Sequence, residues 1–256
     1  MYSSLPWWQR ALSVLAGGVL LVLFWKGVIV LNLVPAILLP SPLDVGQALV
    51  RLAGSAGFWQ NLTATVWTWL AGILVGTLVG ATTGILVGVN RFVWAAVEPW
   101  VEFLRALPSV VLVPLVSLFL GVGASSRLAC SAIVVAALLV STAGTALRSA
   151  SQAHLRLAIA WRASWWQTVA HFLLPAAVSH MAVALKAAIP IALIVAVAAD
   201  MLIATDAGIG KIIMDALAVF DTSTMYGAIV VVGLLGYVAA VLGSVIERLA
   251  IHWSGQ

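Results

Sequence analysis

Long runs of apolar residues constrain the fold of this chain more than any other feature. Six such runs cover residues 12–34, 57–89, 99–120, 128–147, 175–204 and 226–246. A helix needs about 20 mostly apolar residues to cross a bilayer. Only 8% of the residues are charged, against about 25% in a soluble globular domain. The sequence therefore predicts an all-α, polytopic membrane protein with about six transmembrane helices.

Helix-breaking residues separate or interrupt these runs. The proline-rich stretch PAILLPSPLD follows the first run, and residues 43–54 are mixed enough for a short interfacial helix. Pro108 and Pro114 lie inside the third run, where proline removes a backbone donor and favours a kink. The first run is longer than the apolar core of a signal peptide, and we expect it to be a retained helix.

The second run carries glycine at every fourth position. These residues are Gly72, Gly76, Gly80, Gly84 and Gly88. Residues four apart share one face of a helix, and small residues there let membrane helices approach closely. The pattern predicts that this face packs tightly against another span.

The arginines set the orientation, because cytoplasmic loops of membrane proteins carry an excess of Lys and Arg. With the N-terminus in the cytoplasm, six arginines fall at or inside the inner boundary: Arg10, Arg91, Arg148, Arg156, Arg162 and Arg248. Three basic residues then fall outside: Arg51, Arg127 and Lys211. We therefore expect both termini and the polar loop at about residues 148–174 to be cytoplasmic.

Other classes of protein are less compatible with these residues. The scattered charges, 12 Lys and Arg against 8 Asp and Glu, argue against a nucleic-acid partner and are better explained as topology signals. The single cysteine, Cys130, excludes an intrachain disulfide and is expected to be a small buried side chain. We find no paired metal-ligand spacing, no phosphate-binding loop and no Ser–His pair at membrane depth, so no catalytic or metal site is predicted.

Two ionisable residues within the spans are candidates for the translocation path. Lys186 follows Pro175 by eleven residues, about 16 Å along a helix, and burying it in lipid would be costly. It either attracts anions in the path or pairs with an acidic residue of a neighbouring span. Asp200 lies near the outer end of the same run, as a path residue or as an ordinary interfacial carboxylate. Glu102 and Arg105, three residues apart, are best explained as a local pair.

The polar loop resembles the cytoplasmic "EAA" loop of ABC importer permeases. The run Arg162-Ala163-Ser164-Trp165-Trp166-Gln167, preceded by Trp161 and followed by Leu174-Pro175, keeps that loop's alanine–serine and leucine–proline spacing. In the family this loop docks in a groove of the ATPase. The resemblance also explains three tryptophans that are otherwise costly to leave in water, although an aromatic belt at the membrane interface would explain them too.

Further stretches resemble the sulfonate, taurine and nitrate branch of this family in the same order. They are LPSP at 39–42, EPWVEFLRALP at 98–108, FLGVG at 119–123, AADM at 198–201 and GIG at 208–210. Relatives usually carry Glu at the position of Asp200. The resemblance covers about residues 38–250.

Two positions of the loop depart from the family pattern. Arg162 stands at the family's glycine and Arg156 at its glutamate. A bulky side chain is disfavoured where the backbone needs a positive φ. The loop is either a more basic coupling helix that docks an acidic groove on its own ATPase, or a tolerant loop whose sequence has relaxed.

The resemblance implies a single permease domain over residues 1–256, in a bacterial inner membrane. It implies two permease chains, as a homodimer or with a paralogous partner, two ABC ATPase subunits and an extracytoplasmic substrate-binding protein. The cargo would be a small anionic solute of the sulfonate, taurine or nitrate kind, although relatives also carry neutral or cationic pyrimidine-like cargo. The chain itself would be no enzyme and need no cofactor, because ATP would bind to the ATPase subunits.

Two other classes remain as alternatives. A secondary transporter without an ATPase usually needs more spans or inverted repeats, and the halves of this chain show no convincing repeat. An intramembrane enzyme lacks its catalytic pair, as described above.

Overall fold

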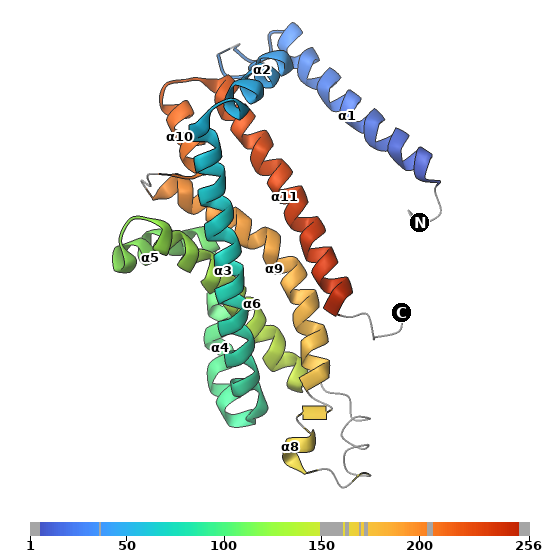
Figure 1. Cartoon of the computed structure of the whole chain (residues 1–256), viewed down its shortest axis with the longest axis vertical. Coiled ribbons are helices and arrows are strands. Elements are labelled where there is room, and N and C mark those ends of the chain that lie inside the picture. The colour runs from blue at the N-terminus through green and yellow to red at the C-terminus, as the bar shows by residue number, and fades with distance from the viewer. Residues whose placement is uncertain are drawn as a thin grey trace. The chain divides into compact units, whose positions relative to one another are not determined.

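The computed structural model describes residues 6–35, 37–148, 161, 164–168, 170–171, 174–203 and 207–250, and all their regular structure is helical. The helices, shown in Figure 1, are α1 (Trp7–Val30), α2 (Pro42–Ala53), α3 (Ala56–Val89), α4 (Arg91–Ala106), η2 (Ser109–Val111), α5 (Leu112–Leu120), α6 (Ala124–Arg148), α8 (Trp165–Thr168), α9 (Leu174–Leu202), α10 (Ile209–Ala218) and α11 (Thr222–Ala250). The predicted all-α class is confirmed.

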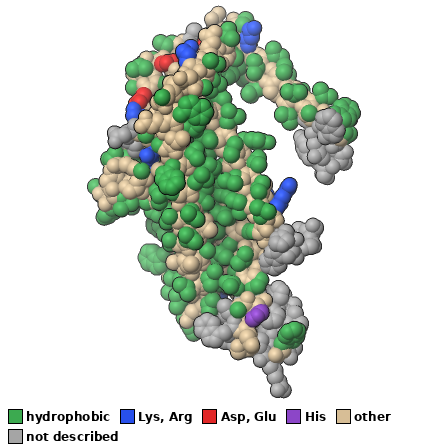
Figure 2. All heavy atoms as spheres, in the orientation of Figure 1, with side chains coloured by type: hydrophobic (Ala, Val, Ile, Leu, Met, Phe, Trp, Pro, Cys, Tyr) green, Lys and Arg blue, Asp and Glu red, His purple; other side chains and the backbone are tan. Residues whose placement is uncertain are grey.

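Five described helices are long and apolar enough to cross a membrane, and a sharply bent pair can supply a sixth crossing. The five spans are Ala11–Val30, Ala56–Val89, Ala124–Arg148, Ala177–Leu202 and Thr222–Ala250. Hydrophobic side chains cover most of the face seen in Figure 2, and charged ones are few. This surface suits lipid as the solvent.

The third predicted span differs from a simple helix. It begins at Arg91 and not at Pro99, because the Asn90 side chain caps the backbone N–H groups of Phe92 and Val93. Leu107 then adopts an extended conformation before Pro108, and the chain turns by 92° into the segment Ser109–Leu120. Pro114 lies in the first turn of α5, where the missing N–H costs little.

The chain divides into two compact units, of which the first holds residues 1–59 and 212–231. Its α2 begins with a capping box, in which Ser41 accepts from the Asp44 backbone and Asp44 accepts from the Ser41 backbone. Trp25 of α1 donates its indole N–H to the Pro40 carbonyl at 3.1 Å and lies 5.9 Å from the Tyr226 ring, centroid to centroid. The short helix predicted after the proline-rich stretch is confirmed.

The second unit holds residues 60–211 and 232–256. Its core forms between α6 and α9, where Val135, Leu139, Ile189 and Leu193 are buried. Trp69 of α3 closes one side of this core and donates its indole N–H to the Ile189 carbonyl at 3.0 Å.

The glycine stripe of α3 lies against α6. A Cβ at Gly76 would lie 2.5 Å from the Ala132 carbonyl oxygen, and one at Gly88 would lie 2.9 Å from the Gly144 Cα. No side chain fits at these distances, so the two backbones touch directly. The close packing predicted from the four-residue spacing is confirmed.

Candidate functional site

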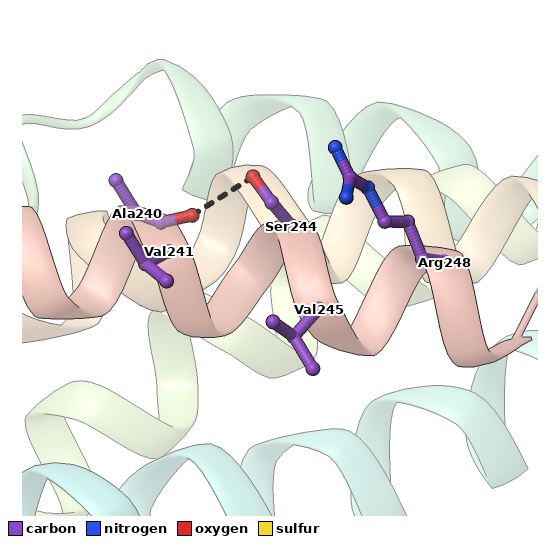
Figure 3. A pocket seen from close by; sticks show the side chains of 5 residues that line it. All are labelled: Ala240, Val241, Ser244, Val245 and Arg248. Atoms are coloured by element: carbon purple, nitrogen blue, oxygen red, sulfur yellow. Dashed lines mark hydrogen bonds between the residues drawn. The ribbon is translucent and has the colours of Figure 1, made fainter.

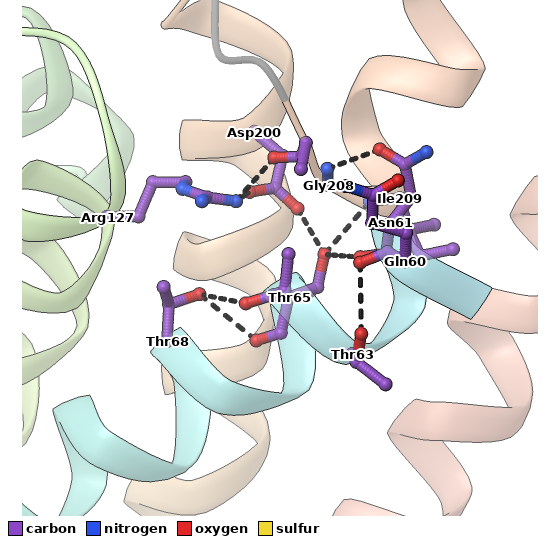
Figure 4. Close-up of polar contacts among 11 residues, drawn as sticks. Gln60, Asn61, Thr63, Thr65, Thr68, Arg127, Asp200, Gly208 and Ile209 are labelled. Carbon is purple, nitrogen blue, oxygen red and sulfur yellow. Dashed lines mark hydrogen bonds and ion pairs between the residues drawn. The ribbon is translucent and has the colours of Figure 1, made fainter. Parts of the chain in front are cut away.

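A buried polar cluster joins α3, α6 and α9 in the second unit (Figure 4). Arg127 of α6 forms an ion pair with Asp200 of α9, with 2.8 Å between Nη1 and Oδ1. The second carboxylate oxygen accepts the Thr65 hydroxyl of α3 at 2.5 Å. The two charged side chains are 6% and 0% exposed, so neither reaches the surface. Charges this deeply buried persist because they are paired and hydrogen-bonded.

The same cluster holds the turn that begins α10. Asn61 accepts the Gly208 backbone N–H at 2.6 Å, and Thr65 accepts that of Ile209 at 2.9 Å. Gly208 has a φ of 147°, and a Cβ there would overlap the Asp200 carboxyl group. Glycine is therefore required at the start of the GIG sequence. The cluster fixes three spans and this turn in one arrangement.

Replacing Thr65 with valine should lower the unfolding free energy by about 1–3 kcal/mol, because the isosteric change leaves buried partners without a hydrogen bond. The matched control is Thr82→Val. Thr82 is exposed, and its hydroxyl contacts carbonyls of its own helix, so this change should stay within about 0.5 kcal/mol. Denaturant titration of the detergent-solubilised protein measures both, and equal effects would contradict the structural role of Thr65.

Both predicted path candidates have ion partners in the structure. Asp200 pairs with Arg127, as described. Lys186 pairs with Glu247 of α11 at 2.7 Å, and its side chain is 44% exposed. The pairing alternative for Lys186 therefore describes the observed contact, while a path role for either residue stays a prediction.

A second polar group lies at the break between α4 and η2. Arg105 donates from Nη1 to Glu102 at 2.7 Å and to the Ser141 hydroxyl of α6 at 2.9 Å. Ser141 in turn donates to Glu102 at 2.7 Å. The local pair predicted between Glu102 and Arg105 is confirmed, and Ser141 closes it into a triangle.

A cavity of about 230 Å³ opens beside this triangle. Arg105 and Ser109 are its polar lining residues, and its apolar wall comes from Leu104, Leu112, Ile133, Val134, Ala137, Leu138 and Ile191. Sequence reasoning did not find this cavity. The sequence does contain one indication of the cavity, because Arg105 lies three residues before Pro108 within an apolar run. A proline that breaks a membrane span can leave a polar cavity beside the break.

The described part of the predicted coupling loop is short. Trp161 is exposed, and α8 begins at Trp165. Gln167 accepts the Ser164 backbone N–H at 2.8 Å, and the Ser164 hydroxyl accepts that of Gln167 at 3.3 Å, which caps this turn. Pro175 lies in the first turn of α9. Arg156, Arg162 and Ala163 lie outside the described residues, as do the side chains of Trp165 and Trp166.

One further hollow and the potential metal ligands give no second candidate site in the part of the chain that the structure describes. The hollow in Figure 3 is lined by Ala240, Val241, Ser244, Val245 and Arg248, all from α11, so its polar groups do not converge from separate elements. Within the described residues, no group of three or more His, Cys, Asp or Glu side chains could hold a metal ion.

Fold and site together define a multi-pass membrane protein with one sharply bent span, a buried ion pair and a cavity at the bend. The family model "Binding-protein-dependent transport system inner membrane component" matches residues 72–251. The chain belongs to this family. It is the permease component of a binding-protein-dependent ABC importer, a transport subunit of the inner membrane and not an enzyme.

Curated relatives match over most of the chain. It is 26% identical to the taurine transport system permease protein TauC of Escherichia coli, covering 97% of this chain and 91% of that protein. It is 27% identical to the riboflavin transport system permease protein RibX of Chloroflexus aurantiacus, covering 93% and 88%. It is also 27% identical to the putative aliphatic sulfonates transport permease protein SsuC of Escherichia coli, covering 85% and 82%.

Solved structures share the fold. A chain of the MetNI methionine ABC transporter in an inward-facing conformation superposes with a TM-score of 0.62 at 19% identity, covering 80% of this chain and 96% of that one. A chain of an amino acid ABC transporter with histidines gives a TM-score of 0.56 at 13% identity, covering 81% and 94%. The chain has the fold of type I ABC importer permeases.

Proposed function

We propose that this permease imports a small organic solute with an anionic sulfonate head, such as an alkanesulfonate or taurine, delivered by an extracytoplasmic substrate-binding protein. Two of the three relatives described above are named for taurine or aliphatic sulfonates, and this observation carries the proposal. The relative named for riboflavin supports a broader range of cargo across the family.

Two permease chains would form the path, as a homodimer or with a paralogous partner, because one chain of about six spans is too small to enclose it. Two ABC ATPase subunits would bind the loops at 148–174 and supply ATP, so the permease would need no cofactor of its own. Both termini would be cytoplasmic, which the arginine distribution supports. Lipid and these subunits are the proposed partners, with no nucleic acid.

A deletion within the loop tests whether the loop binds the ATPase. Deletion of residues 156–168 should abolish co-purification of the ATPase from detergent, because the deletion removes the proposed docking segment. The membrane-embedded helices should still fold. Mass spectrometry of the tagged chain's partners measures the loss, and size-exclusion chromatography checks the fold. An ATPase that still co-purifies with the deletion variant would contradict the role of the loop.

A charge-reversed loop separates the two explanations of its arginines. If the loop is a specialised basic coupling helix, Arg156→Glu combined with Arg162→Gly should lose the ATPase. If the loop is tolerant, the same double variant should keep or improve the association, since it restores the family residues.

A further inference from the structure

The cavity beside Arg105 lies about halfway along two of the candidate membrane spans. Ile133 and Leu138, which line it, lie near the middle of α6 (Ala124–Arg148), and Ile191 lies near the middle of α9. The remaining wall comes from the two arms of the bent pair, α4 and η2–α5. Secondary transporters build solute sites near the bilayer midplane from broken helices, and the bent pair of this permease provides a similar break.

The guanidinium of Arg105 is oriented by two hydrogen bonds and has further N–H donors. Its bonds to Glu102 and Ser141 both run through Nη1. An arginine carries five N–H donors, so donors beyond those on Nη1 have no partner among the described residues. Contacts from α4 and α6 thus orient the group before any ligand arrives, which lowers the entropy lost on binding.

Two other charged pairs in the same unit do not line this cavity. Asp200 and Arg127 are paired with each other, are 0% and 6% exposed, and do not line this cavity. Lys186 is paired with Glu247 and does not line this cavity. Arg105 is the cation that lines the cavity of about 230 Å³ at the bend.

We propose that Arg105 is the anion-recognition residue of the translocation path. Its guanidinium would bind a single sulfonate or carboxylate head through paired N–H groups, assisted by the Ser109 hydroxyl. The wall of leucine, isoleucine, valine and alanine side chains would take a short alkyl body. The cavity is smaller than the roughly 300–1,000 Å³ pockets that hold drug-sized ligands, which favours an anion of few carbons. This assignment rests on the proposed function.

Cysteine labelling of the cavity tests the assignment without the ATPase. The full chain, with Cys130→Ala to remove its own thiol, carries a reporter at Ser109→Cys and is labelled in membrane vesicles. Two methanethiosulfonate reagents of similar size, one bearing a sulfonate and one a trimethylammonium group, are compared by rate. Arg105 should favour the anionic reagent. The anionic-to-cationic rate ratio should then fall about tenfold in Arg105→Gln, the scale of one nearby charge in a partly aqueous site.

Matched variants separate recognition from folding. Arg105→Lys should keep most of the ratio, because it keeps the charge, and Arg51→Gln, an exposed arginine of α2, should leave it unchanged. Added ethanesulfonate should slow labelling only where residue 105 is basic. A second reporter, Ala137→Cys, reads the wall that α6 contributes.

An unchanged ratio in Arg105→Gln would overturn the proposal. So would the absence of labelling at both reporters, because the cavity would then be closed to aqueous ions. Neither outcome depends on ATPase binding, so failure of the importer mechanism is read separately, from co-purification.

Discussion

Leucine at position 80 should force α3 and α6 apart and lower the unfolding free energy by about 3 kcal/mol or more. A Cβ at Gly80 would lie 2.7 Å from the Ala136 Cα and 2.8 Å from its carbonyl oxygen. Overpacking a well-packed core costs about 1–3 kcal/mol when side chains can adjust. Here the obstruction is backbone, which cannot rotate away, so we expect the upper end of that range or beyond.

The chain provides its own control for this change. Gly236 of α11 has no atom within 4 Å of a built Cβ, so Gly236→Leu alters composition and helix propensity equally without closing a contact. Fluorescence-detected size-exclusion chromatography after heating ranks the two variants. Similar losses of folded protein for both would mean that the glycine stripe does not hold α3 to α6.

Alanine in place of Arg127 should be comparably damaging, because it leaves the Asp200 carboxylate buried without its cation. Removing one partner of a buried ion pair typically costs about 3–5 kcal/mol. Replacing both partners with apolar residues, Arg127→Met with Asp200→Leu, should recover a large part of that loss, since no buried charge then remains. Denaturant titration of the purified protein compares the single and double variants.

The exposed pair on α9 and α11 is the natural control. Lys186 is 44% exposed and its partner Glu247 is 24% exposed, so Lys186→Ala should cost less than Arg127→Ala, whose partner Asp200 is fully buried. If Arg127→Ala were no more harmful than Lys186→Ala, the cluster around Asp200 would not be a structural lock of the spans.

Local patterns predicted the fold well because membrane helices depend on local properties. Apolar runs of sufficient length indicated the spans, and the spacing from Gly72 to Gly88 indicated the tight face of α3. Proline at 108 predicted a kink. The 92° turn was not predictable, because its size depends on how α5 packs against α6 and α9.

The site was harder to predict, because it depends on pairs far apart in the sequence. Arg127 and Asp200 are 73 residues apart, and the sequence around either residue does not identify the other as its partner. Ser141 completes the Arg105 triangle from another helix, which turns a simple pair at i and i+3 into the edge of a cavity. A sequence shows which ionisable residues lie within the spans, but the packing of the helices determines their partners.

Uptake into proteoliposomes tests whether this chain works as part of an ATP-driven importer. The permease is reconstituted with its co-purified ATPase, its binding protein and labelled taurine, with and without ATP on the cytoplasmic side. We expect uptake that requires ATP, the binding protein and the ATPase together, and that is lost when residues 156–168 are deleted. Uptake by the permease alone, driven by an ion gradient and indifferent to ATP, would contradict it and identify a secondary transporter.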